Sequence, residues 1–393
     1  MRTKSIFFIL FLSVFLFSAC TTNSAENSIN KTTTTSTVSN IPTWVATDAT
    51  QVSEDGVLNT IYCDSLSSIY NALSNAVAGD KIVIAPGTYQ GYSTESSNYT
   101  TNSGTSTACF VITASGTKSN PIIITTQSSS DTVILKGEGQ GYWPDDTSNQ
   151  YPYVFYITGD YVTIQNIQLT NGSKALILDN SNYSVVNNIE VYDIGDEGIH
   201  IRDGSTNVTV ENCYVHDTGT VRSKYGEGIY VGSDYKKWTD EGGKYVKECD
   251  YAQILNNYIG PNVTAEHIDY KEGASYLTVS GNIFDAKGMC DTANGGTSFM
   301  DLKGNNAKIY ANTGYQNNNS NEYVKNAFEI HDKYEGWGNN NSIYNNTVYF
   351  CDDNTSAYIT YVGDTSSVTG SPTGNKSYDN TRSPSNGNYT NID

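Results

Sequence analysis

A short phrase of alternating apolar residues that ends in asparagine recurs along the chain and limits the folds it can adopt. The phrase reads VTIQN, SVVNN, VTVEN and AQILNN, then LTVSGN, AKIYAN and NSIYNN. Its asparagines are Asn166, Asn188, Asn212, Asn257, Asn282, Asn312 and Asn346, and they are 22, 24, 45, 25, 30 and 34 residues apart. A basic period of 22 to 25 residues with insertions is typical of a solenoid. The alternation indicates strands, so we predict an all-β, right-handed parallel β-helix.

The repeated asparagine also argues against the main alternative, a β-sandwich. A sandwich accounts for short alternating strands but not for an asparagine at the same place in each unit. In a β-helix, equivalent turn residues of successive coils lie about 4.8 Å apart. Stacked amides at that spacing can hydrogen-bond to one another, so we predict an asparagine ladder along the β-helix.

The first 20 residues have the pattern of a secretory signal peptide. A basic start precedes an apolar run from Ile6 to Phe17, and small residues precede Cys20. The sequence around Cys20 resembles a bacterial lipobox, although leucine usually stands where Phe17 does. The resemblance implies lipidation of Cys20 and a cell-surface or periplasmic lipoprotein, and ordinary secretion is the alternative. Residues 21–45 lack the apolar residues needed for a fold and should be a flexible spacer.

The remaining chain divides by periodicity into a β-helix domain at residues 46–350 and a loose C-terminal segment at 351–393. Six cysteines remain when Cys20 is set aside, an even number in a chain expected to be exported. We expect a disulfide between Cys213 and Cys249 because they flank what looks like an insertion. No CxxC pair occurs, which argues against a zinc site.

The chain is strongly acidic, with 41 Asp and Glu against 22 Lys and Arg, a formal net charge of −19. Such a charge repels nucleic acid, so we expect no nucleic-acid partner. We also expect a monomer that meets a membrane only through a lipid anchor. A polyanionic substrate would need a local basic site or a bridging cation.

The segment SLSSIYNALSNAVAGDKIVIAPGTYQG has apolar residues at helical spacing, then Gly-Asp, then an apolar strand. It closely resembles the N-terminal cap and first coil of the pectate-lyase-like β-helix superfamily. The segment NPIIITTQSSSDTVILKGEG resembles the next coil of that superfamily. The resemblance implies the same fold, with an amphipathic helix covering the first coil.

Five later strands align from coil to coil without gaps, and their inward residues form apolar core columns. The first outward column is His200, Tyr230, Asp269, Asp301 and Glu329. The second outward column is Arg202, Gly232, Lys271, Lys303 and His331. Just ahead, at the turn, a third column contains Glu197, Glu227 and Glu266. Hydrophobic stacking does not explain this concentration of charge.

These columns allow two interpretations. The first is a structural lattice of salt bridges on an exposed sheet face. The second is a reaction centre, in which Lys303 and a bound cation lower the pKa of Lys271 and make it a usable base. The three glutamates of the turn column offer hard oxygen ligands, which suit Ca²⁺.

The sequence EHIDYKEG, followed by GNIFD and later DLKGN, resembles the chondroitinase B and alginate lyase family of polysaccharide lyases. In that family, Glu266 matches a calcium-binding glutamate, Lys271 the lysine base and Lys303 an arginine. The chain departs from the family twice, because it has Thr264 where a second glutamate stands and lysine in place of that arginine.

The resemblance implies an exported lyase that cleaves a uronic-acid-containing polysaccharide, such as alginate, pectate or a glycosaminoglycan, by Ca²⁺-assisted β-elimination. Ca²⁺ held by the three turn glutamates would neutralise the substrate carboxylate. Lys271 would take the C5 proton, and Lys303 or His331 would stabilise charge or protonate the leaving oxygen. The remaining candidate site residues are Asp269 and Asp301 for catalysis, and Arg202, Tyr230, His200 and Trp238 for substrate binding.

Two alternatives from other functional classes remain. The first is a non-catalytic surface β-helix that binds glycans or builds the cell envelope, with the charged columns as a lattice. The second is a glycoside hydrolase of the polygalacturonase type, in which Asp269 and Asp301 would act on a water between them.

Overall fold

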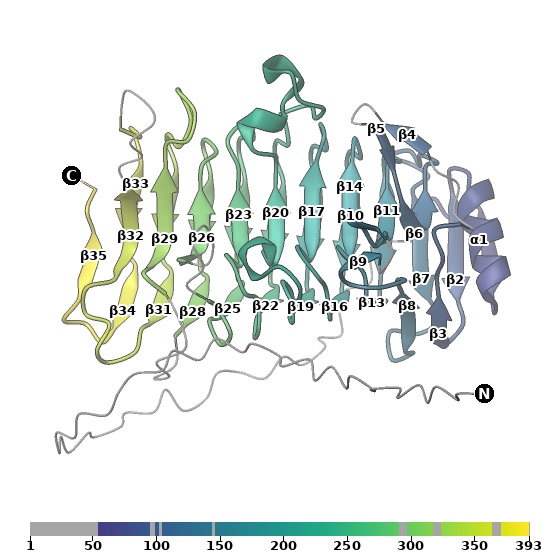
Figure 1. Cartoon of the computed structure of the whole chain (residues 1–393), viewed down its shortest axis with the longest axis horizontal. Coiled ribbons are helices and arrows are strands. Elements are labelled where there is room, and N and C mark those ends of the chain that lie inside the picture. Colours follow the sequence, from purple (N-terminus) through teal and green to yellow (C-terminus); the bar gives the residue numbers. More distant parts are fainter. Residues whose placement is uncertain are drawn as a thin grey trace, which may run out of the picture. The chain divides into compact units, whose positions relative to one another are not determined.

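The computed structural model describes residues 54–94, 99–101, 104–143, 146–290, 297–316, 324–363 and 371–392. The expected signal peptide, Cys20, the spacer and the first residues of the expected domain lie outside these ranges. The described strands follow one another around successive coils, and equivalent strands of neighbouring coils pair in parallel (Figure 1). Within the described residues, no helix is long and apolar enough to cross a membrane.

Three parallel sheets make up the β-helix. The first has 11 strands: β1 (Asn59–Cys63), β2 (Asp80–Ile84), β7 (Ile122–Thr126), β12 (Val162–Gln165), β15 (Val185–Asn187), β18 (Thr209–Glu211), β21 (Gln253–Leu255), β24 (Thr278–Ser280), β27 (Lys308–Tyr310), β30 (Ser342–Tyr344) and β33 (Lys376–Tyr378). The second has 10: β3 (Gly87–Gln90), β8 (Val133–Lys136), β13 (Gln168–Thr170), β16 (Glu190–Tyr192), β19 (Tyr214–Val215), β22 (Tyr258–Ile259), β25 (Ile283–Asp285), β28 (Thr313–Tyr315), β31 (Thr347–Tyr349) and β34 (Thr381–Ser383).

The third sheet, called the site sheet below, also has 10 strands: β6 (Ala108–Ile112), β11 (Tyr153–Ile157), β14 (Leu176–Asp179), β17 (Ile199–Arg202), β20 (Ile229–Val231), β23 (Ile268–Tyr270), β26 (Ser298–Leu302), β29 (Asn326–His331), β32 (Tyr358–Gly363) and β35 (Asn388–Thr390). Two antiparallel pairs lie outside these sheets, β4 (Tyr99–Thr101) with β5 (Gly104–Ser106) and β9 (Tyr142–Trp143) with β10 (Asp146–Gln150).

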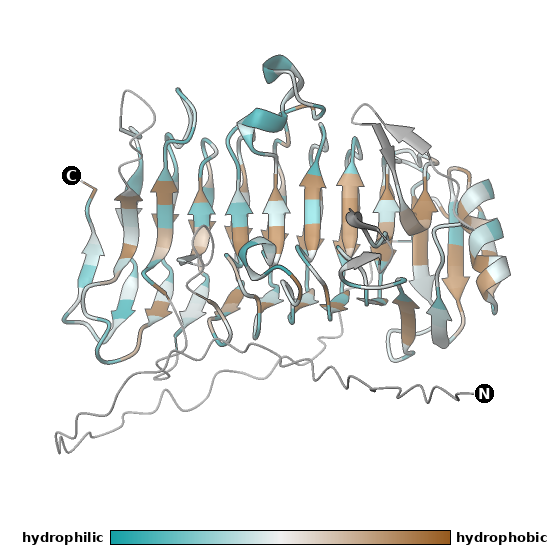
Figure 2. Cartoon of the chain, in the orientation of Figure 1, coloured by the Kyte–Doolittle hydropathy of each residue, from teal (hydrophilic) through white to brown (hydrophobic). Residues whose placement is uncertain are grey.

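The core lies between the three sheets and consists of the inward residues of each strand. On the site sheet, Ile199 pairs with Ile229, Ile229 with Ile268, and Ile268 with Met300, and all four are fully buried. The gap-free alignment of these strands is therefore confirmed. Figure 2 shows the apolar residues concentrated on the strands. Side chains of alternate residues point to opposite faces of a strand, so these apolar residues all face the interior of the coils. The predicted β-helix fold is therefore confirmed.

A short helix covers the first coil, as predicted. Helix α1 (Leu66–Asn75) begins at Ser65, whose side chain accepts a hydrogen bond from the backbone of Ser68 in a capping box. Its apolar stripe, with Ile69 and Leu73 fully buried, contacts β1, β2 and β6 (Figure 1). The helix therefore shields the N-terminal end of the core from water.

The asparagine ladder is continuous in the C-terminal half of the β-helix, and among the earlier anchors the Asn188 amide donates to Asn166 over 2.8 Å. Asn257 donates to Asn282, Asn282 to Asn312, and Asn312 to Asn346, each over 2.9 Å between side-chain atoms. Asn346 continues the ladder by donating to Asn380 over 3.0 Å. These amides are buried, so the ladder satisfies polar groups that have no access to water.

The earlier anchors occupy a different position in the turn. Asn166, Asn188 and Asn212 have left-handed backbone conformations, with φ of 61°, 50° and 56°. In later coils that corner position precedes the ladder residue, as Asn256 precedes Asn257. Asparagine suits both positions, because it tolerates left-handed φ and its amide can stack. The repeat is therefore shifted by one residue between the two halves of the chain.

Replacing Asn312 with alanine is expected to lower the free energy of unfolding by about 2–3 kcal/mol. The substitution removes the amide that donates to Val279 and Asn346, and it removes the acceptor of the buried backbone N–H of Asn282. Urea denaturation measures the change. Asn75→Ala on the exposed face of α1 is the control and should change stability by less than about 0.5 kcal/mol. Equal losses in both variants would contradict a stabilising ladder.

The described parts of the C-terminal segment, residues 351–363 and 371–392, are not loose, which corrects our expectation for residues 351–393. Strands β32 to β35 extend the three sheets and pair with the preceding coil. The sequence hides this coil because polar residues take inward positions. Ser377 lies opposite Ile343, and buried Arg382 lies opposite Val348 with its guanidinium carbon 4.3 Å from the Phe350 ring centroid.

The expected disulfide between Cys213 and Cys249 is also wrong. Both cysteines are free and buried, and the described residues contain no disulfide. Cys213 is an inward core residue whose thiol donates to the carbonyl of Glu211 over 3.2 Å, and burial raises its pKa to about 12. Burial also raises the pKa of the Cys249 thiol. Both residues therefore act as small core side chains.

Candidate active site

The predicted outward columns lie on the site sheet in the expected register. Tyr230 pairs with His200 on one side and with Asp269 on the other, and Asp301 follows Asp269 and precedes Glu329. Two cavities of about 470 and 640 Å³ lie over these strands. They share six lining residues, Asp234, Lys236, Glu266, Lys271, Asp301 and Lys303. The two cavities therefore form one groove, with the central residues of both columns where they meet.

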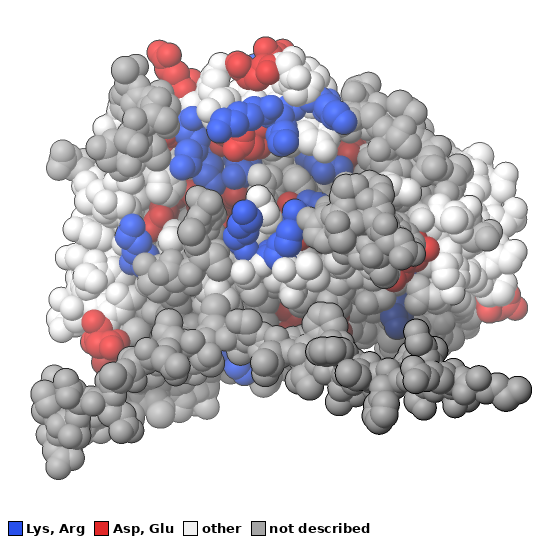
Figure 3. Space-filling view, in the orientation of Figure 1, with Lys and Arg blue, Asp and Glu red and all other residues white. Residues whose placement is uncertain are grey.

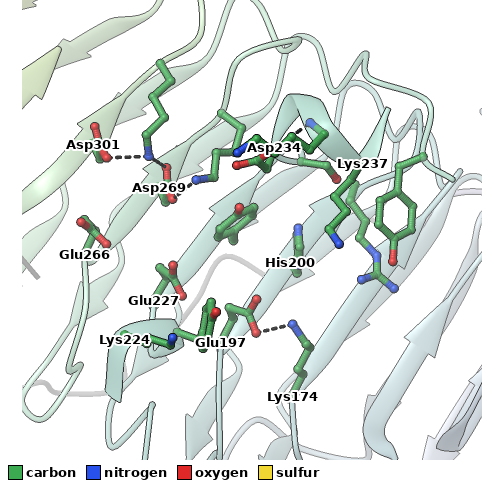
Figure 4. A pocket seen from close by; sticks show the side chains of 18 residues that line it. Lys174, Glu197, His200, Lys224, Glu227, Asp234, Lys237, Glu266, Asp269 and Asp301 are labelled. Carbon is green, nitrogen blue, oxygen red and sulfur yellow. Dashed lines mark hydrogen bonds and ion pairs between the residues drawn. The ribbon is translucent and has the colours of Figure 1, made fainter. Parts of the chain in front are cut away.

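A chain of ion pairs crosses the floor of the groove (Figure 4). Asp269 accepts from Lys271 through one oxygen and from Lys303 through the other, both over 2.8 Å. Lys303 also contacts Asp301, at 2.5 Å. These side chains are nearly inaccessible to solvent, and burial of an unpaired charge is costly. One carboxylate thus holds two buried ammonium groups side by side.

The pKa of Lys271 shifts in the direction opposite to our expectation. Burial alone would lower it, but the carboxylates of Asp269 and Glu272 raise the pKa well above its ordinary value. The pKa of Lys303 is raised as well, because Asp269 and Asp301 outweigh its burial. The expectation rested on repulsion between the two lysines, which the shared carboxylate overcomes. Both lysines are therefore charged in the free site.

His331 lies at one end of this chain of ion pairs. Its Nε2 is 3.1 Å from Glu329 and 3.4 Å from Asp301. Burial lowers its pKa, but Asp301 and the hydrogen bond to Glu329 raise it above the ordinary value. Lys303 and His331 in turn lower the pKa of Asp301 to about 2, against the effect of burial. His331 therefore assists Lys303 in keeping Asp301 ionised.

Three carboxylates form a compact cluster beside this chain. Oxygens of Glu227, Glu266 and Asp269 lie within 4.8 Å of one another. Burial and the neighbouring carboxylates raise the pKa of Glu227 well above its ordinary value and that of Glu266 to about 7. One buried oxygen of Glu227 has no hydrogen-bond partner among the described residues. The cluster therefore favours a proton or a cation.

This cluster differs from the predicted set of metal ligands. Glu197, the third predicted ligand, instead pairs with Lys174 on the neighbouring coil. Asp269 takes the place of Glu197 in the cluster, which the column assignment missed because Asp269 was counted with the strand rather than the turn. Thr264, at the position of the absent glutamate, donates to the carbonyl of Ser223 and packs between glycines of the turn. Its hydroxyl is therefore used within the turn.

Stability should fall with rising pH across the titration of Glu266. Its pKa of about 7 in the folded chain lies above the ordinary value of 4.5, so its stabilising effect is complete below pH 4.5. That effect, of the order of 3 kcal/mol, is lost as pH rises through 7. Urea denaturation at pH 5 and 8 should show this loss in the wild type and in Glu335→Gln at an exposed turn. Glu266→Gln should remove most of this loss of stability between pH 5 and 8. An unchanged pH dependence in that variant would contradict the assignment of the titration to Glu266.

Tyr230 and His200 line the cavity beside the lysines. The Lys271 ammonium lies 5.0 Å from the centroid of the Tyr230 ring, and the His200 ring lies 4.3 Å from the same centroid. Burial and the charges of Arg202 and Lys174 lower the pKa of His200 well below its ordinary value, so its imidazole is neutral. It donates from Nε2 to the carbonyl of Gly232 over 2.9 Å.

Arg202 reaches the cavity wall but is less free than predicted. Its guanidinium donates twice to Asp179, over 2.6 and 3.1 Å, and Tyr156 donates to the same carboxylate. The Tyr245 ring covers it, with a centroid 4.7 Å away. Arg202 is 4% exposed, so it contributes charge to the wall rather than a free donor.

Trp238 is not in the groove, contrary to our expectation. It lies in the insertion after β20, between the short helices η2 (Tyr235–Lys237) and η3 (Thr239–Glu241). It is 2% exposed, donates to the carbonyl of Ser233 and packs edge-on against Tyr334. An added Cβ at Gly273 would lie 2.6 Å from its ring, so glycine is needed there. Trp238 therefore anchors the insertion, and neighbours of Trp238 form the wall of the groove.

Sequence reasoning missed the lysines around the rim of the groove. They come from separate turns, and no strand alignment brings them together. Figure 3 shows Lys and Arg gathered at the centre of this face of an otherwise acidic chain. The lysines lining the groove beyond the predicted pair are Lys174, Lys224, Lys236, Lys237, Lys325 and Lys333. The net charge of −19 therefore conceals a local basic surface that suits a polyanion.

Solved structures include one at substantial sequence identity. A crystal structure of an alginate lyase from Paenibacillus sp. str. FPU-7 is 37% identical, with 84% of this chain and 97% of that chain covered and a TM-score of 0.70. The pectate lyase Pel9A is 15% identical, with 86% and 80% covered and a TM-score of 0.52. The surface protein and adhesin PfbA of Streptococcus pneumoniae is also 15% identical, with 85% and 84% covered and a TM-score of 0.51.

The last two likenesses show the fold alone, while the first also extends to sequence. The comparison with curated protein sequences gave no significant match. A family model described as "Pel9A-like, right handed beta helix region" matches residues 44–255, just over half of the chain. This match and the stacked parallel sheets agree on a polysaccharide-lyase-like β-helix, and the chain belongs to the Pel9A-like right-handed β-helix family.

Proposed function

We propose that this chain is a polysaccharide lyase that cleaves a uronic-acid-containing polymer by β-elimination, and that alginate is the first substrate to test. The observation that carries the proposal is the pair of buried ammonium groups of Lys271 and Lys303 at the centre of a basic groove. Identity of 37% with an alginate lyase over most of both chains supports it.

The lysines suit the first requirement of the reaction. The C5 proton of a uronate is too weakly acidic to remove while the adjacent carboxylate keeps its full charge. Lys303, fixed between Asp269 and Asp301, presents a positioned cation to that carboxylate and to the anion that develops when the proton leaves. Preorganised charge of this kind lowers the barrier because it needs no reorganisation during the reaction.

Lys271 and Asp269 can together supply the base. The Lys271 ammonium must first lose its proton, and Asp269 lies 2.8 Å away to receive it. Glu227 and Glu266 beside Asp269 favour proton uptake by this carboxylate cluster, because a bound proton reduces the repulsion among its negative charges. The neutral amine of Lys271 then takes the C5 proton.

Tyr230 suits the role of the acid. Burial, Asp269 and Glu227 raise its pKa well above the ordinary value, so its hydroxyl keeps its proton at neutral pH. It lies in the cavity under the Lys271 ammonium, where it can donate to the glycosidic oxygen as the C4–O bond breaks. Nε2 of His331 contacts Asp301 and Glu329, and we assign to His331 the role of positioning Asp301.

The carboxylate cluster fits a calcium ion in its chemistry. Glu227, Glu266 and Asp269 supply three converging oxygen donors, and the Glu227 oxygen without a partner is available to a ligand. When bound, Ca²⁺ would supply a further positive charge that neutralises the substrate carboxylate. The competing occupant is a proton shared by the two glutamates.

Calcium should therefore stabilise the chain more at pH 8 than at pH 5.5, because protons compete for the same oxygens. At about 100 times its Kd, a ligand that binds only the folded chain stabilises it by about 2.7 kcal/mol. Calorimetry of the chelator-treated protein with added CaCl₂ measures the shift in Tm. Glu266→Gln should abolish the shift and Glu335→Gln should retain it. An equal shift in all three proteins would place calcium elsewhere.

The function is tested by incubating the purified protein with alginate, polygalacturonate and glycosaminoglycans and following the ultraviolet absorbance of the unsaturated product. A rise with at least one uronate polymer, with or without chelator, supports a lyase. A rise in reducing ends without the unsaturated product would indicate a hydrolase. Asp269 and Asp301, the pair predicted for a hydrolase, both bind Lys303 and are not free to act on a water, which disfavours that outcome.

A glycan-binding surface protein is the second candidate. The saturated ion-pair chain and the likeness in fold to an adhesin favour it. Binding of alginate without cleavage would support it. Export of the chain and lipidation of Cys20 stay predictions that cell fractionation and mass spectrometry would test.

A further inference from the structure

The basic side chains of the groove fall into two classes. The inner ones, Lys174, Arg202, Lys271 and Lys303, each pair with a carboxylate and are largely buried. The outer lysines are Lys224, Lys236, Lys237, Lys325 and Lys333, all exposed. Within the described part of the chain, none of the outer lysines makes an ion pair. They are therefore the cations left available to an incoming anion.

The outer lysines frame the reaction centre on two sides. On the coil of β20, Lys224 lies in the 3-10 helix η1 (Ser223–Tyr225) before the strand, and Lys237 lies in η2 after it. Figure 4 shows Lys224 and Lys237 on different sides of the cavity, apart from the ion pairs on its floor. On the coil of β29, Lys325 immediately precedes the strand and Lys333 follows it by two residues.

The coils of β23 and β26, which carry Lys271 and Lys303, lie between these two framing coils. Three coil steps separate β20 from β29, about 14 Å along the β-helix axis. Lys237 lines only the cavity on the β20 side, and Lys325 and Lys333 line only the cavity on the β29 side. Unpaired cations are therefore available beyond both ends of the reaction centre.

We propose that the outer lysines are carboxylate subsites on both sides of the reacting sugar, so that the groove binds an internal segment of a polyuronate and cuts within the chain. The inference rests on the proposed lyase function. An enzyme that works from a chain end needs such subsites mainly on one side. The net charge of −19 would repel the polymer elsewhere on the chain, which makes these lysines the main source of attraction.

Two double variants test the two sides separately. Lys224→Gln with Lys237→Gln removes charge on the β20 side, and Lys325→Gln with Lys333→Gln removes it on the β29 side. Lys308→Gln with Lys376→Gln makes the same charge change on exposed residues of the first sheet and is the matched control. Each groove variant should raise KM for alginate by about 3–10-fold with kcat within twofold, since exposed pairs are individually weak. The control should leave both constants unchanged.

The size of the early products gives an independent readout. Wild-type protein should release oligomers of mixed length from the start of the reaction, and added salt should raise KM by screening the lysines. Release of a single short product from the start, or an unchanged KM in either groove variant, would overturn the inference while leaving the lyase function in place.

If no polymer is cleaved, affinity electrophoresis in an alginate-containing gel tests the lysine subsites separately from the lyase function. If the wild type and the control are retarded and both groove variants are not, the result would support the lysine subsites in a protein that is not a lyase. Unretarded wild type would overturn the subsites as well as the polyuronate assignment. A gel containing neutral dextran should retard none of the four proteins.

Discussion

Replacing Lys271 with methionine is expected to lower kcat on the polymer that the chain cleaves by about 10²–10⁴-fold. Methionine keeps the length of the side chain and removes its only nitrogen, while Asp269 retains its second partner, Lys303. The initial rate of unsaturated product formation measures the loss, and calorimetry checks that the fold persists. Lys376→Met, on an exposed residue of the first sheet, should keep full activity.

A second substitution distinguishes the two tasks that a lysine could have at this position. Lys271→Arg keeps a positive charge for the substrate carboxylate but cannot lose its proton at neutral pH. Loss of kcat in this variant with little change in KM would support the role of base. Substantial activity would instead assign Lys271 to charge neutralisation alone and would leave the base to another group.

Asp269→Asn is expected to lower the free energy of unfolding by about 3–5 kcal/mol, because it leaves two buried ammonium groups without their shared carboxylate. Urea denaturation measures the loss. Asp240→Asn breaks an ion pair with Lys247 that is largely exposed, with 63% of the aspartate side chain accessible, and should cost less than about 1 kcal/mol. Similar losses in the two variants would contradict the importance of the shared carboxylate.

A double-mutant cycle keeps this prediction testable if Asp269→Asn is too unstable to purify. Lys271→Met should recover part of the stability of the aspartate variant, because the Lys271 ammonium pairs with no other carboxylate among the described residues. The coupling energy between the two positions should reach about 0.5–3 kcal/mol, the range for contacting residues. Additive effects would show that the two side chains do not depend on each other.

The fold and the strand register could be predicted because they follow from local sequence. The inward positions of β17, β20, β23 and β26 are apolar, so one-residue shifts would bury charge and are excluded. Polar residues at inward positions hid the last coil, where Ser377 and Arg382 replace the usual apolar residues. The asparagine ladder itself was predicted. In the coils after Asn212, however, the asparagine that forms it lies one position later in the turn.

The site was predicted less completely because its energetics depend on contacts between coils. Register placed Asp269 beside Asp301 but did not say that Lys271 and Lys303 would both reach the same carboxylate. The strand register also gave no information on side chains in the turns. The ion pair between Lys174 and Glu197 was therefore missed. Trp238 shows the same limit, since an aromatic residue in an insertion can face a groove or anchor the insertion, and only packing decides.

The unequal ends of the β-helix have a consequence for how it should unfold. Helix α1 seals the first coil, whereas no described element pairs with the outer side of β33, β34 or β35. In a solenoid each coil is stabilised chiefly by its neighbours, so opening should begin at the uncovered end and travel inward. Amide hydrogen exchange should therefore be fastest in the last coil and slower toward β23 and β26. The reaction centre would then stay intact while the C-terminal coil frays.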